Sequence, residues 1–95
     1  MNNEQIDNTD YYRLPCGKYL EDFIADFNLS FAMGSALKYM WRAGKKDGES
    51  KEKDLKKAGH YVAFIAEHDN RDVFDVGKDL IGYHILARCW GKLEQ

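Results

Sequence analysis

The segment that decides the fold reads SALKYMWRAGKK and spans Ser35 to Lys46. Wound as a helix, it is apolar on nearly every side, and it ends in a glycine followed by two lysines. Ser35, Lys38 and Arg42 are spaced i, i+3 and i+7, which places them on one stripe of that helix. The sequence holds no acidic residue from Asn28 to Lys46, so these cations have no local partner. Because an unpaired cation is costly to remove from water, the pattern predicts that an anion meets them.

Apolar residues at helical spacing predict further helices on both sides of this segment. Ser30 and Ser50 are suited to cap helix N-termini, and Gly44 stands where a C-terminal glycine cap is expected. Gly34 predicts the close approach of a neighbouring helix. No segment alternates convincingly with period two, so the sequence predicts an all-α domain. The expected helices cover about 18–27, 31–43, a stretch after Ser50, and 73–93.

Composition limits the chain to one small domain. We expect a polar, loose N-terminal arm over 1–10 and a single compact four-helix domain over 11–95. The central helix is apolar almost all round, so we expect a neighbour or a second subunit to cover it, as in a homo-oligomer. The sequence has two scattered cysteines, no secretion leader and no apolar run of about 18 residues. We therefore expect a cytoplasmic protein without a membrane partner.

Charge is distributed unevenly along the chain. Residues 38–57 contain eight basic and four acidic side chains, whereas the whole chain has a formal charge of −2. This polarity favours a local anion site on an acidic body, and it argues against a nucleic-acid partner because the domain as a whole is not basic.

The predicted phosphate site consists of the cations of the central helix and the loop after it. Arginine offers a planar fork of donors and lysine a mobile point charge, and both suit phosphate. The alternative is that Lys38 and Arg42 pair with Asp54 or with acids of the first helix, as charge runs often do. The candidate phosphate-binding residues are Lys38, Arg42, Lys45 and Lys46.

Aromatic side chains near these cations are candidates for stacking on a base or contacting a ribose. They are Tyr12, Tyr39, Trp41 and Tyr61. Asp54 shares a helix face with Tyr61 and could orient Arg42, bind Mg²⁺ or contact a ribose hydroxyl. The alternative is that Asp54 has no functional role and forms a surface ion pair. His60, His68 and His84 lack the spacing of metal ligands, and no Walker motif is present, so we expect no metal site.

These residues also resemble a known pattern. The chain is similar to a small family of bacteriophage proteins described as nucleotide kinase-like, or SaV-like, domains of unknown function. Tyr11 and Ser35 depart from the histidine and asparagine usual there, and the last helix lies outside the resemblance, which covers about 10–67. The matching segments are Asp10-Tyr11-Tyr12, Phe31 to Lys46, and Asp54 to Tyr61.

The resemblance implies nucleotide chemistry in the cytoplasm of an infected host cell. The first hypothesis is a homo-oligomeric protein that captures a phosphorylated nucleotide, such as a host defence signal. The second is a P-loop-free nucleoside monophosphate kinase, in which Asp54 would be catalytic and Mg²⁺ the cofactor. A third is a protein-binding inhibitor of a host nucleic-acid-binding defence complex. The lack of an evident base and of a complete acidic metal cluster favours binding over catalysis.

Overall fold

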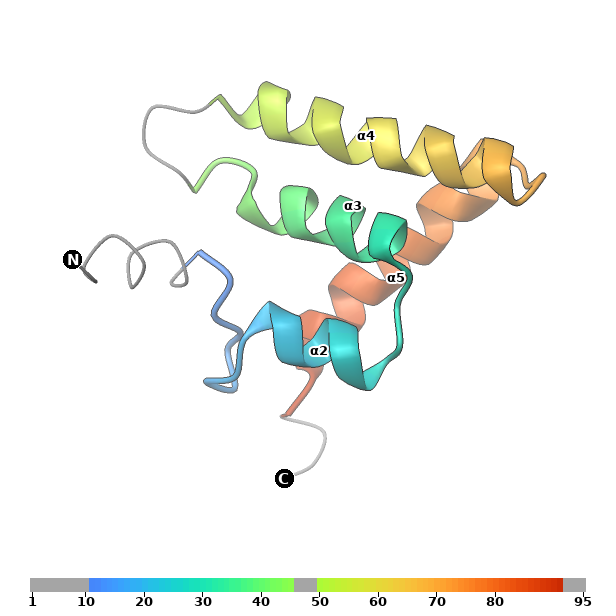
Figure 1. Cartoon of the computed structure of the whole chain (residues 1–95). Helices are drawn as coiled ribbons and strands as arrows, with labels where there is room; N and C mark the ends of the chain where they lie inside the picture. Colours follow the sequence, from blue (N-terminus) through green and yellow to red (C-terminus); the bar gives the residue numbers. More distant parts are fainter. Residues whose placement is uncertain (1–10, 46–49, 92–95) are drawn as a thin grey trace.

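The computed structural model of the chain describes residues 11–45 and 50–91. Within these ranges the chain forms four helices and no strand, as the apolar spacing predicted. Figure 1 shows α3 and α4 side by side and antiparallel, with α5 crossing them and α2 beside the C-terminal end of α5. The expected arm over 1–10 lies outside the described residues. The helices are α2 (Leu20–Asp26), α3 (Phe31–Arg42), α4 (Lys51–His68) and α5 (Val73–Cys89).

Side-chain caps determine where three of the helices begin. The backbone N–H of Met33 donates to Ser30 Oγ at 3.1 Å, and that of Lys53 donates to Ser50 Oγ at 3.0 Å. Both serines therefore cap as predicted, because each satisfies an otherwise orphan donor of the first turn. Asp72 caps α5 in the same way, accepting from the N–H of Phe74 at 2.8 Å.

Two asparagines end α2 and α4. Asn28 and Asn70 adopt left-handed φ values of 53° and 55°, a conformation that asparagine tolerates better than most residues. The following N–H groups then reach back, Leu29 to the carbonyl of Ile24 and Arg71 to the carbonyl of Ala66. Each helix thus closes its last turn and releases the chain in a new direction. Gly44 has a φ of +82° after α3, which confirms its predicted role.

The core forms around α3, which contacts α4 and α5. Gly34 confirms the expected close approach, because a Cβ there would lie 3.1 Å from a methyl carbon of Ile24 in α2. Phe23 of α2 packs edge-on against Trp90, which joins α2 to the end of α5. None of the helices in the described ranges is long and apolar enough to cross a membrane. The residues of α3 that are buried are Ala32, Met33, Gly34, Ala36, Leu37 and Trp41.

The last helix is shorter than the sequence predicted. It ends at Cys89, whereas the apolar spacing placed its end at about residue 93. Trp90 is extended, and Gly91 has a φ of +85° in close contact with Cys16. A side chain at position 91 would clash with Cys16, so tertiary packing of the N-terminal loop ends α5 where local preference alone would continue it.

Candidate anion-binding site

Arg42 and Asp54 form a buried ion pair where α3 and α4 lie side by side. Arg42 Nη2 donates to Asp54 Oδ1 at 2.7 Å, and Arg42 Nε donates to Oδ2 at 3.3 Å. The Asp54 side chain is 1% exposed and that of Arg42 is 13% exposed. This carboxylate raises the pKa of Arg42 further above its usual value, chiefly through the hydrogen bond. The guanidinium is therefore fixed and charged at every accessible pH.

This pair corrects the premise that Arg42 lacks a partner. The absence of acids from Asn28 to Lys46 is real, but the antiparallel return of α4 brings Asp54 to the end of α3. Of the two interpretations left open by the sequence, pairing between Arg42 and Asp54 is the one that the structure shows. Asp54 is buried at this pair, and its predicted catalytic role stays a prediction. The described residues hold no group of three or more His, Cys, Asp or Glu side chains arranged for a metal ion.

The three candidate tyrosines pack around this pair. Tyr12 accepts a long hydrogen bond of 3.5 Å from Arg42 Nη1, and the Arg42 guanidinium lies 5.1 Å from the centroid of the Tyr39 ring. Tyr39 and Tyr61 are stacked with ring centroids 6.1 Å apart. Burial raises the pKa of Tyr12, against the opposing effect of Arg42. These rings therefore fill space between α3, α4 and the N-terminal loop, and they support Arg42.

Lys38 lies on the exposed side of the same cluster. Its Nζ is 5.4 Å from the centroid of the Tyr12 ring, and it forms no ion pair with any residue that the structure describes. Lys57 lies in a similar way 5.2 Å from the centroid of the Tyr39 ring. Lys46, the remaining predicted phosphate ligand, is outside the described residues. The predicted cationic stripe is thus divided between the paired Arg42 and an exposed Lys38.

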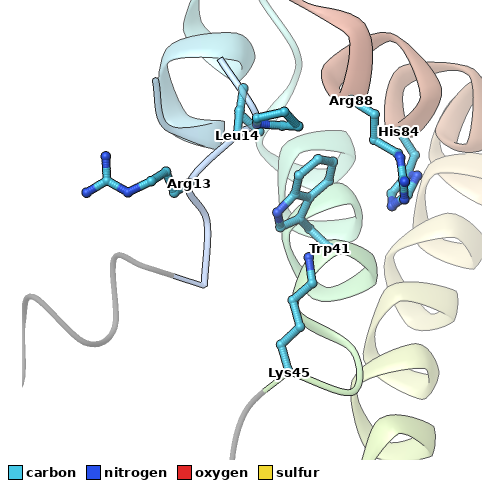
Figure 2. A pocket seen from close by; sticks show the side chains of 7 residues that line it. Arg13, Leu14, Trp41, Lys45, His84 and Arg88 are labelled. Carbon is cyan, nitrogen blue, oxygen red and sulfur yellow. The ribbon is translucent and has the colours of Figure 1, made fainter. Parts of the chain in front are cut away.

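A separate hollow of about 560 Å³ lies between the N-terminal loop, the end of α3 and α5. Figure 2 shows Trp41 of α3 and Lys45, just after that helix, facing His84 and Arg88 of α5 across it. We call this hollow, with these four residues, the Trp41 pocket. None of the described residues that line it is acidic; they are Arg13, Leu14, Pro15, Trp41, Lys45, His84 and Arg88.

Trp41, which lines this pocket, carries a buried hydrogen-bond donor that is unsatisfied within the described chain. Its side chain is buried, and its indole Nε1 has no hydrogen-bond partner among the described residues. Leaving a buried donor unpaired costs about 1–3 kcal/mol, so the site is set up for an acceptor. Lys45 Nζ lies 4.7 Å from the indole centroid, and the His84 ring lies 5.0 Å from it. Both neighbours occupy space around the ring, so Trp41 is suited to donate a hydrogen bond rather than to stack on a base.

The charges in the pocket repel one another. Burial lowers the pKa of Lys45, and the nearby Arg88 lowers it further. Burial also lowers the pKa of His84, with smaller contributions from Arg88 and Lys45. Arg13 does not add to this group, because Figure 2 shows its side chain directed away from Trp41. It donates instead to the Tyr19 hydroxyl at 2.7 Å.

Sequence reasoning found half of this pocket. Lys45 and Trp41 were both predicted to take part in ligand binding, although Trp41 was expected to stack on a base. His84 was considered only as a metal ligand and set aside for its spacing, and Arg88 was not singled out. A signal was present in their i, i+4 spacing on the last helix, which places a histidine and an arginine on one face. No sequence signal near His84 or Arg88 indicates that this face of the last helix meets Lys45.

The structure defines an all-helical domain with a positively charged pocket between its central and last helices. The chain belongs to DUF3310, a family of proteins of unknown function, whose family model matches residues 2–63. That match includes Arg42, Lys45 and Asp54 but ends before α5, which supplies His84 and Arg88. Neither a curated protein nor a solved structure matches the chain.

Proposed function

We propose that this protein binds a phosphorylated nucleotide and that the phosphate occupies the Trp41 pocket. One observation carries the proposal: Lys45 and Arg88, two cations that repel each other, line a hollow together with Trp41, whose buried indole N–H has no partner, and none of the described residues that line it is a carboxylate. An anion would relieve the repulsion, and one that reaches the buried indole N–H would also accept its hydrogen bond. No neutral ligand does both.

Phosphate suits this donor set better than a simple halide or a single carboxylate. Arg88 offers a planar fork, Lys45 a mobile ammonium, and Trp41 a single directed donor, so a tetrahedral group with several oxygens can satisfy them together. The pocket volume of about 560 Å³ lies within the range of roughly 300–1,000 Å³ typical of small-molecule sites. It therefore has room for a phosphorylated organic molecule as well as its phosphate.

The nucleotide part of the proposal is supported by the resemblance to bacteriophage nucleotide kinase-like proteins. That resemblance also suggests the setting, the cytoplasm of an infected cell, where capture of a nucleotide signal would counter host defence. In this arrangement Lys38 lies at the surface as an auxiliary cation, while Arg42 acts by holding α3 and α4 together. Capture is favoured over phosphoryl transfer because Asp54, the residue assigned to catalysis in the kinase hypothesis, is buried against Arg42.

The test is titration calorimetry with the four common nucleoside monophosphates and with inorganic phosphate. Lys45→Gln and Arg88→Gln should each weaken binding by about 10- to 100-fold, because a hydrogen bond to a charged group contributes about 1.5–3 kcal/mol. Lys56→Gln, an exposed lysine of α4 outside the pocket, is the matched control and should bind like the wild type. If none of these probes binds, or if both pocket variants bind like the control, the proposal is wrong.

Capture and turnover are separated by a second experiment. The protein is incubated with a nucleoside monophosphate, ATP and Mg²⁺, and the small molecules are analysed by chromatography after heating. Capture predicts that the bound monophosphate is released intact and that no diphosphate accumulates. Diphosphate formation that is lost in Asp54→Asn would establish the kinase instead.

A further inference from the structure

The outward face of α5 carries apolar side chains that nothing in the described chain covers. Phe74 is 76% exposed, Ile81 51% and Ile85 56%. Their spacing of i, i+7 and i+11 places them on one narrow stripe at 3.6 residues per turn. We call it the α5 stripe. The buried residues of the same helix, Val76, Leu80 and Ala87, lie on the opposite side. A helix that is apolar on both sides is typical of one that is covered on both sides.

Other exposed apolar residues differ from this stripe. Phe31 contacts the ring of Tyr61, and Phe64 is stacked on the ring of His68, so both already pack within the chain. Among the described residues no ring contact involves Phe74, and neither Ile81 nor Ile85 belongs to the core cluster. The stripe is therefore the surface with the most to gain from a partner.

We propose that the α5 stripe is the interface of a homodimer, in which α5 pairs antiparallel with α5 of a second copy about a two-fold axis near Ile81. A two-fold interface uses the same surface on both copies, so the stripe must complement itself. With Ile81 on the axis, Ile85 of each copy lies opposite position 77 of the other. That position is Gly77, and the space where its Cβ would point is open. An isoleucine side chain fits over a glycine, which gives the interdigitation that close helix packing requires.

Charge also selects a second copy in this orientation. The N-terminal half of α5 and its cap carry Asp72, Asp75 and Asp79 against one cation, Lys78, whereas the C-terminal half carries Arg88 and no acid. Antiparallel pairing places the acidic half of each helix beside the basic half of its partner and opposes the two helix dipoles. Parallel pairing would place acidic halves side by side.

The expected affinity follows from the size of the contact. α5 has 17 residues and is about 25 Å long at a rise of about 1.5 Å per residue, with a width of about 10 Å. A contact between single helices of this size falls below the about 800 Å² per partner of a standard interface. We therefore expect a weak dimer with a dissociation constant in the micromolar range.

Sedimentation equilibrium of the full chain from about 5 to 500 µM, a range chosen to span micromolar dissociation, tests the dimer directly. The wild type should shift from monomer to dimer across that range, and Ile81→Asp should remain monomeric. Phe31→Asp, which replaces an even more exposed apolar residue on α3, should dimerise like the wild type. A wild type that stays monomeric throughout, or an Ile81→Asp variant that still dimerises, would overturn the proposal.

Disulfide crosslinking tests the orientation and does not depend on the charged variant folding. In a Cys89→Ser background, Ile81→Cys should crosslink under mild oxidation, because both copies bring position 81 to the axis. Ile85→Cys should not, because the two positions 85 would be about 12 Å apart along the axis, beyond the roughly 7 Å Cα separation that a disulfide spans. Equal crosslinking at both positions would indicate parallel pairing and refute the proposed geometry. None of these measurements involves a nucleotide, so the dimer and the proposed function can fail separately.

Discussion

Replacing Arg42 with alanine should destabilise the protein severely, although Arg42 lies at the end of a helix. The substitution removes two charge-assisted hydrogen bonds, of 2.7 Å and 3.3 Å, from a carboxylate that is almost completely buried. Removing one partner of a buried ion pair costs about 3–5 kcal/mol. A domain of 95 residues has a total stability of roughly 5–14 kcal/mol, so this one substitution consumes a large part of it.

Urea denaturation followed by circular dichroism measures this loss as a fall in the free energy of unfolding. At about 4–8 °C per kcal/mol, the melting temperature should fall by more than about 10 °C. The double variant Arg42→Met with Asp54→Leu should recover part of the loss, because replacing both charges leaves neither buried. If Arg42→Ala unfolds within about 1 kcal/mol of the wild type, as a surface pair would, the pair does not hold α3 to α4.

Further predictions concern the pocket and the chain end. The pKa of His84 is lower in the folded protein than in the unfolded chain. As pH falls below about 6.5, the unfolded chain therefore takes up the proton first and the stability of the fold declines. His84→Gln should flatten this part of a plot of melting temperature against pH. Arg88→Gln should raise the pKa of His84 measured by NMR titration, since it removes one of the repelling charges; an unchanged pKa would contradict the pocket geometry. Gly91→Ala should lower the melting temperature, because position 91 has a positive φ and an added Cβ would clash with Cys16. Gly59→Ala lies in open space within α4 and should raise the free energy of unfolding by about 0.5–1 kcal/mol.

Much of the fold could be predicted because its signals are local. Ser30 and Ser50 cap helices within three residues of their own positions, and Gly44 turns the chain at the residue where the helix pattern stops. The end of α5 was predicted too late, because Gly91 is constrained by contact with Cys16, a residue from the opposite end of the chain. No short stretch of sequence around Gly91 indicates that it contacts Cys16.

The candidate site followed the same division. Lys45 and Trp41 were identified because they belong to the segment from Ser35 to Lys46, whose cations have no acidic residue near them in the sequence. Arg88 and His84 belong to the last helix, outside both the family match and the resemblance, and they meet Lys45 only because α5 crosses α3.

By itself, then, the order of amino acids determined the helices, their caps and the surplus of positive charge after α3, since each of these depends on neighbours within a turn or two. Only the tertiary structure decided which charges are neutralised and which are not. Arg42 finds a carboxylate 12 positions away, while Lys45 faces another cation across a hollow. The reason is physical: electrostatic energy depends on distance and burial in space, and helix packing sets both.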